Sequence, residues 1–250
     1  MRARLAMLIA ATALTAACQP GALLGGGAPD TAEIGVPEGT LDLASATAAL
    51  PALPVAAPAD VPGYERDCGP GDGCVFGPSW SDDVGVAFGR NGCDTRNDIL
   101  ARDLQPGTVN GRAVPKRVED NNCVVLEGVL ADPFTGQTLH FTKKRAGALQ
   151  VDHVVALAAA WRAGASTWQP QVRQDFANDP RNLILVDGGT NQSKGDSTAD
   201  EWLPPNADYH CEYARIVVTV KSAYGLSVTA AEQQALQSVL GRCSTTPPAP

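Results

Sequence analysis

Four polar residues in the second half of the chain have types and an order that suit metal-assisted hydrolysis. Asp152 and His153 follow a short apolar run, and Asn182 begins the next one. Asn191 lies nine residues further on. An imidazole accepts a proton from water near neutral pH, whereas carboxylate and amide oxygens are ligands for a hard cation. Each residue alone has an ordinary explanation, such as a buried histidine or a helix-capping asparagine. Their combined order and spacing therefore carry the prediction.

Two strands and a helix are needed to bring these residues together. Residues 149–151 form a short strand pattern, residues 183–186 are apolar and short enough to be a strand, and the turn at 187–189 leads into a helix. Adjacent residues at the end of a strand point to opposite faces, so Asp152 can face a cation while His153 faces a water molecule. The sequence therefore predicts a strand, strand, helix unit with a polar residue at each junction.

Apolar periodicity predicts further elements around this unit. Helices are expected at 94–104 and 154–165, and residues 123–142 are typical of a β-hairpin because a turn sequence separates two apolar runs. Two helices are expected at the C-terminus, where Gly225 ends the first and a capping box that starts at Thr229 begins the second. The predicted fold class is therefore α+β.

The N-terminus has the composition of a secretory signal followed by a linker. Residues 1–18 combine two arginines, a short apolar run and small residues before Cys18. This cysteine resembles the acylated cysteine of a lipobox, but Leu14 lies four residues before it rather than three, so ordinary signal cleavage stays an alternative. Residues 19–63 are rich in Ala, Gly and Pro and predict a flexible tether, which leaves 64–250 as the folded domain. We therefore expect an exported protein, either a cell-envelope lipoprotein or a secreted one.

Seven cysteines in an exported chain predict disulfides rather than a zinc site. No Cys-x-x-Cys pair is present, and if Cys18 is acylated the other six form an even set that allows 15 pairings. Cys211 and Cys243 lie 16 residues on either side of Ser227 in the expected turn, so an antiparallel helical hairpin places them at the same height. The remaining assignments pair Cys68 with Cys74 across a tight loop and Cys93 with Cys123.

The composition excludes several broad classes of protein. The chain has 250 residues, 44% of them hydrophobic, and a formal charge of −8. This balance excludes a multispanning membrane protein and a wholly disordered chain. The acidic charge also argues against a polybasic nucleic-acid binder. Residues 64–250 carry only −5 after the signal (+2) and the tether (−5) are removed, so a local basic surface is compatible with the sequence.

The residues around the candidate site resemble those of HNH (ββα-metal) endonucleases. The matching runs are Val-Asp-His-Val-Val-Ala-Leu at 151–157, Asn-Leu-Ile-Leu-Val at 182–186 and Asn-Gln-Ser-Lys-Gly-Asp at 191–196. More closely, the chain resembles exported bacterial proteins related to the C-terminal domain of the GmrSD restriction enzymes, to which the runs at 92–98 and 201–205 are also similar. The resemblance implies a ββα-metal core with an added β-hairpin and a C-terminal helical hairpin, stapled by disulfides.

The resemblance also implies a role for each residue of the candidate site. His153 corresponds to the general base that takes a proton from the attacking water, and Asn182 to the residue that fixes the histidine-bearing segment. Asp152 and Asn191 correspond to the metal ligands. Because both offer oxygen, Mg²⁺ is expected, with Mn²⁺ as a substitute. Two cations are expected to contact substrate phosphate: Lys194 and Arg96.

The implied function is hydrolysis of phosphodiester bonds in DNA, or in RNA, leaving a 5′-phosphate. Nucleic acid is then the substrate, the membrane is contacted through the lipid anchor on Cys18, and no protein partner is implied. Two alternatives stay open, namely a non-catalytic envelope lipoprotein that keeps the fold as a binding module and a phosphodiesterase acting on an envelope polymer. The presence of all four site residues argues against the binding module. The mild acidity of the domain leaves the polymer alternative open.

Overall fold

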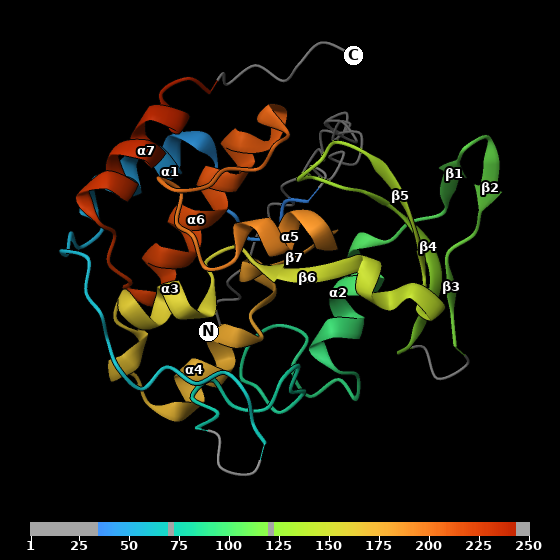
Figure 1. Cartoon of the computed structure of the whole chain (residues 1–250), viewed down its shortest axis with the longest axis horizontal. Helices are drawn as coiled ribbons and strands as arrows, with labels where there is room; N and C mark the ends of the chain where they lie inside the picture. Colours follow the sequence, from blue (N-terminus) through green and yellow to red (C-terminus); the bar gives the residue numbers. More distant parts are fainter. Residues whose placement is uncertain (1–34, 70–72, 120–122, 244–250) are drawn as a thin grey trace, which may run out of the picture. The chain divides into compact units, whose positions relative to one another are not determined.

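The computed structural model describes residues 35–69, 73–119 and 123–243, and these form an α+β fold (Figure 1). The α-helices are α1 (Leu43–Ala49), α2 (Thr95–Asp103), α3 (Leu157–Arg162), α4 (Pro170–Ala177), α5 (Gly188–Lys194), α6 (His210–Tyr224) and α7 (Ala230–Leu240). The strands are β1 (Gly107–Val109), β2 (Arg112–Val114), β3 (Arg117–Val118), β4 (Val125–Ala131), β5 (Thr138–Thr142), β6 (Leu149–His153) and β7 (Leu183–Asp187). Short 3₁₀ helices connect them at Leu50–Ala52, Lys143–Ala148, Ala165–Thr167, Pro180–Asn182 and Ala207–Tyr209. Within the described residues, no helix combines the length and the apolarity needed to cross a membrane.

The antiparallel pair β6–β7 lies between two apolar cores (Figure 1). Leu183 and Leu185 of β7 belong to the core shared with α2 and the β3–β4–β5 sheet. The alternate residues Ile184 and Val186 belong to the larger core built mainly by helices. An apolar run without polar alternation is what a strand covered on both faces requires. The predicted strands at 149–151 and 183–186 are therefore confirmed.

The predicted β-hairpin at 123–142 is also confirmed. β4 and β5 pair in antiparallel fashion, from Ala131 opposite Thr138 to Glu127 opposite Thr142. Asp132 is buried in the turn between them, where its carboxylate accepts hydrogen bonds from the backbone N–H groups of Phe134 and Thr135. β4 and β5 then cover one side of the smaller core, opposite α2.

The C-terminal helices form the predicted helical hairpin. Gly225 ends α6 in the left-handed conformation (φ 62°), which a glycine adopts without steric cost. The hydroxyl of Thr229 accepts a hydrogen bond from the N–H of Glu232 at 3.0 Å and caps α7. The side chain of Lys221 binds the Glu232 carboxylate at 2.6 Å, and both side chains are buried. This ion pair holds the two helices together near their connection.

The structure contains three disulfides with the predicted pairings, Cys68–Cys74, Cys93–Cys123 and Cys211–Cys243. The last one joins α6 to the residue just beyond α7, with 5.8 Å between the Cα atoms. The argument from equal height in an antiparallel hairpin is therefore confirmed.

The predicted tether is wrong from residue 35 onward. α1 packs on α6, and the backbone N–H of Leu41 donates to the hydroxyl of Thr219 at 2.9 Å. Ala46, Leu50 and Leu53 are buried in the larger core. These residues recur at nearly helical spacing, which composition alone hides among Ala and Pro. A helix this short gains its stability from tertiary packing rather than from propensity. The signal sequence and Cys18 lie outside the described residues.

Candidate functional site

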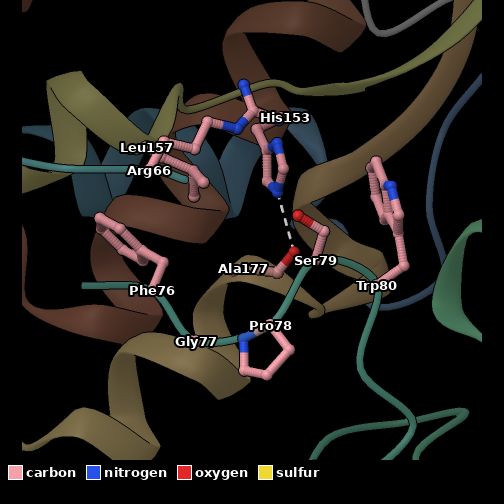
Figure 2. A pocket seen from close by; sticks show the side chains of 9 residues that line it. All are labelled: Arg66, Phe76, Gly77, Pro78, Ser79, Trp80, His153, Leu157 and Ala177. Carbon is pink, nitrogen blue, oxygen red and sulfur yellow. Dashed lines mark hydrogen bonds between the residues drawn. The ribbon is translucent and has the colours of Figure 1, made fainter. Parts of the chain in front are cut away.

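His153 ends β6 and is held from two sides (Figure 2). Its Nε2 hydrogen-bonds the backbone carbonyl oxygen of Ala177 at 2.8 Å. The indole of Trp80 stacks on the imidazole with 5.8 Å between ring centroids and 14° between planes. The imidazole thus has a fixed orientation before any substrate binds.

The surroundings of His153 determine which of its nitrogens can accept a proton. Burial lowers its pKa from 6.5 to about 3, so the ring is neutral near neutral pH. A carbonyl oxygen only accepts hydrogen bonds, so the nitrogen facing Ala177 must carry the ring proton. Nδ1 is then the nitrogen with the free lone pair, and none of the described residues hydrogen-bonds to it. The site therefore presents a neutral imidazole with Nδ1 as the basic atom.

Asn182 fixes the chain directly after His153. Its side chain is fully buried, with Oδ1 accepting from the N–H of Val155 at 2.8 Å and Nδ2 donating to the Val155 carbonyl at 3.1 Å. Its backbone carbonyl accepts from the N–H of Val154 at 2.9 Å. These bonds hold a bend at 154–155, and α3 begins at Leu157 rather than at the predicted 154. The position of Asn182 is the one expected of a residue that holds the histidine-bearing segment.

Asp152 points to the opposite face of β6, toward α5. Its Oδ1 accepts a hydrogen bond at 2.8 Å from Nζ of Lys194, which also donates to the backbone carbonyl of His153 at 2.8 Å. Oδ2 of Asp152 is buried and has no hydrogen-bond partner in the described part of the chain. Burial raises the pKa of Asp152, and the Lys194 ammonium opposes that shift. One carboxylate oxygen is therefore fixed and the other is unsatisfied.

The structure gives Lys194 a different position from the predicted phosphate contact. The side chain is completely buried, and its ammonium group is directed at Asp152 rather than at solvent. Arg96 also differs from the prediction, because its guanidinium donates to the carbonyl of Ala146 at 3.3 Å and is not part of the cleft wall. The sequence predicts that Asn191 and Lys194 lie on one helix, which is α5. It does not predict which of the two side chains points toward the protein interior.

Asp152, His153 and Asn191 all line a cleft of about 480 Å³. Nδ2 of Asn191 donates to Oε1 of Gln150 at 2.9 Å, which orients the amide. A second, much smaller cavity of about 20 Å³ lies on the Ala177 side of the imidazole, lined partly by Trp80 (Figure 2). It has room for about one water molecule, so only the larger cleft can admit a substrate.

The donor set fits a hard cation with few protein ligands. In the described residues no three His, Cys, Asp or Glu side chains converge on one point. Asp152 and Asn191 line the same cleft, and Oδ2 of Asp152 is buried without a partner among the described residues. Mg²⁺ and Mn²⁺ suit such a pair because they keep water and substrate oxygens in their coordination shell.

Sequence reasoning missed the residues that the segment before α2 contributes. Arg66 and Tyr64 line the cleft, and Trp80 covers the histidine. The nearest signal in the sequence is the tight loop closed by the Cys68–Cys74 disulfide. The sequence predicts this disulfide but does not predict which part of the fold the loop packs on.

Comparisons with known proteins identify the family of the chain. The family model of the GmrSD restriction endonucleases, C-terminal domain, matches residues 95–239, more than half of the chain. An uncharacterized secreted protein of the fungus Arthroderma benhamiae is 40% identical over 153 residues, covering 60% of this chain and 68% of the fungal protein. No solved structure matches the chain. The family suggests a nuclease-like function, and the secreted relative and the three disulfides are consistent with export. The chain thus belongs to the family of the C-terminal domain of the GmrSD restriction endonucleases.

Proposed function

We propose that the chain is a metal-dependent endonuclease with an HNH-type ββα site, which hydrolyses phosphodiester bonds of DNA or RNA. The observation that carries the proposal is the state of His153, a neutral imidazole whose tautomer is fixed by Ala177 and whose Nδ1 is unpaired. β6, β7 and α5 supply the two strands and the helix of such a site. The family match supports a nuclease on independent grounds.

His153 is the general base of this proposal. Its Nδ1 takes a proton from the water that attacks the phosphorus atom, and its Nε2–H stays on the carbonyl of Ala177. The bonds from Asn182 to Val155 hold the chain after His153, and the indole of Trp80 restrains the ring itself. A base fixed in this way requires no rearrangement when substrate arrives.

Asp152 and Asn191 would hold the cation, and Lys194 orients Asp152. When bound, Mg²⁺ or Mn²⁺ would neutralise charge on the phosphate and stabilise the departing oxygen. The bond from Lys194 to Oδ1 leaves Oδ2 of Asp152 as the free ligand atom. Lys194 is then a positioning residue, which replaces its predicted contact with phosphate.

The decisive experiment compares two histidine variants of the disulfide-bonded protein. His153→Ala should lower cleavage of plasmid, single-stranded DNA or RNA by about 10²–10⁴-fold, the usual cost of losing a general base. Binding of Mn²⁺, measured by calorimetry, should persist because Asp152 and Asn191 remain. The matched control is His140→Ala, since His140 pairs with Glu127 outside the cleft.

Three results would overturn the proposal. Cleavage by His153→Ala at the rate of the wild type would show that His153 is not the general base. Full activity in EDTA would show that no cation is required. A wild-type protein that cleaves none of the three nucleic acids with Mg²⁺ or Mn²⁺ would favour a binding module or an enzyme that acts on another polymer.

We further propose that the protein is exported and anchored through an acylated Cys18. The support is the N-terminal sequence together with the secreted relative. Wild-type protein should partition with membranes, and Cys18→Ser should release it. A mature N-terminus without lipid would contradict the anchor while leaving the nuclease proposal intact.

A further inference from the structure

A segment that precedes the family match reaches the candidate active site. The matched region begins at residue 95, whereas the segment made of 61–69 and 73–80 contributes Arg66 to the cleft and Trp80 to the wall behind His153 (Figure 2). The imidazole of His153 lies between these two side chains (Figure 2). The site is therefore completed by residues that the family model does not include.

This segment is firmly attached to the rest of the fold. The indole N–H of Trp161 lies 3.2 Å from the carbonyl of Val61 and 3.3 Å from that of Pro62. The ring of Tyr64 contacts the rings of Phe76 and Trp161, each at 6.3 Å between centroids. A residue mounted between these anchors has a defined position.

The segment also closes on itself around Arg66. The N–H of Val75 donates to the carbonyl of Glu65 at 3.0 Å. The N–H of Cys74 donates to the carbonyl of Asp67 at 3.1 Å, beside the Cys68–Cys74 disulfide. These contacts flank Arg66 on both sides, so its backbone is held although its side chain is exposed.

Arg66 is a cationic residue of the cleft whose hydrogen-bond donors are not bound to other described residues. Among the described residues its guanidinium has no hydrogen bond and no ion pair. Arg162, which also lines the cleft, is bound to Asp196 at 2.7 Å, and Lys194 is bound to Asp152. Arg66 and His153 line the same cleft (Figure 2). An unpaired guanidinium beside a general base is placed to bind the substrate.

We infer that Arg66 binds a backbone phosphate of the nucleic acid next to His153. A guanidinium offers paired N–H donors that match two phosphate oxygens, and its charge cannot be lost by deprotonation. The domain as a whole is mildly acidic and repels a polyanion, so local cations in the cleft must supply the attraction. The inference rests on the proposed nuclease function and names one of its substrate contacts.

The test measures binding without cleavage. Arg66→Ala is introduced into the His153→Ala protein, and the affinity for a short fluorescein-labelled DNA or RNA oligonucleotide is measured by anisotropy in EDTA. The matched control is Arg90→Ala in the same background, because Arg90 is exposed, pairs with Asp83 and lies outside the cleft. Arg66→Ala should weaken binding by about tenfold and reduce the salt dependence of log K by about one unit of slope. Arg66→Lys should recover part of the affinity, because it restores the charge without the paired donors.

The outcomes separate this inference from the nuclease proposal. If Arg66→Ala and Arg90→Ala bind equally well while the protein with His153 intact cleaves nucleic acid, the role of Arg66 is refuted and the nuclease stands. If no oligonucleotide binds and none is cleaved, the nuclease proposal is refuted, and the inference about Arg66 is refuted with it. Equal loss with both variants would indicate a diffuse charge effect and would also overturn the specific contact.

Discussion

The molecule contains two buried lysine–carboxylate pairs that differ in one respect. Lys221 binds Glu232 between α6 and α7, and Lys194 binds Asp152 between α5 and β6. In each pair the ammonium also donates to a backbone carbonyl, that of Ser227 or that of His153. Among the described residues, an orphaned buried oxygen occurs at Asp152 and not at Glu232.

This difference separates a structural ion pair from a prepared binding site. Leaving a buried polar atom unpaired costs about 1–3 kcal/mol, so folding alone gives no reason to retain one. Asp152 lines a cleft together with a histidine, and its buried Oδ2 has no partner among the described residues. Glu232 lies between two helices, where nothing further has to bind. Orphaned oxygens also occur at Asp98 and Asn178, which do not line this cleft, so Asp152 is distinguished by the combination of an orphaned oxygen with the cleft.

The largest effect on folding is expected in the helical hairpin. Lys221→Ala should lower the free energy of unfolding by about 3–5 kcal/mol, because it leaves the Glu232 carboxylate buried without a partner. Replacing both partners by apolar residues, as in Lys221→Met with Glu232→Leu, should recover most of that loss. Urea unfolding measures both, with exposed Lys144→Ala as the control. A loss below about 1 kcal/mol for Lys221→Ala would mean that the pair is not a staple of the hairpin.

A large effect on catalysis is expected from the other carboxylate, that of Asp152. Asp152→Asn keeps the shape and the bond to Lys194 but removes the charge, and should lower cleavage by about a hundredfold or more, since even outer-shell changes at metal sites cost 10–100-fold. Glu232→Gln is the matched change in the structural pair and should leave kcat within about twofold of wild type. Equal losses of kcat in the two variants would abolish the distinction drawn between the pairs.

A smaller effect is expected on stability when Mn²⁺ is added. A cation that binds only the folded protein should raise its free energy of unfolding by about 2–3 kcal/mol at a hundredfold excess over Kd. The wild type and Glu232→Gln should both show this increase in thermal melts, whereas Asp152→Asn should not. Stabilisation of Asp152→Asn to the same extent would place the cation elsewhere.

The last effect is a pH dependence of stability that originates in the site and is small near neutral pH. Because burial lowers the pKa of His153 from 6.5 to about 3, the unfolded chain binds a proton in this range that the folded chain does not. Stability is therefore complete above pH 6.5 and falls by about 1.4 kcal/mol per pH unit as the pH drops toward 3. His153→Ala should remove this slope, as measured by urea unfolding at several pH values, and His140→Ala should keep it. An unchanged slope in His153→Ala would show that the imidazole is not buried in its neutral form.

Much of the fold could be predicted because, in several elements, the local sequence pattern favours the same structure as tertiary packing does. The uninterrupted apolar run 183–186 predicts a strand covered on both faces, and Gly225 with the cap at Thr229 predicts the helical hairpin. α1 escaped prediction because its sequence is ordinary for a linker and its stability comes from contact with α6. Propensity contains no information on such contacts.

The candidate site could be predicted only where the spacing of residues along a strand determines the direction of their side chains. Alternation along β6 correctly places Asp152 and His153 on opposite faces, and Asn182 lies where a residue that fixes the loop is needed. The inward orientation of Lys194 depends on how α5 rotates against the sheet. Arg66 reaches the cleft through a segment distant in sequence, and no periodicity relates it to His153.

The alternating burial of β7 has a consequence for how the protein opens. Leu183 and Leu185 anchor the strand in one core while Ile184 and Val186 anchor it in the other, so neither core can come apart without releasing this strand. The amides of β6 and β7 should accordingly be among the last to exchange with deuterated solvent, at the free energy of global unfolding. A general base attached to such a strand loses its geometry only when the whole domain unfolds.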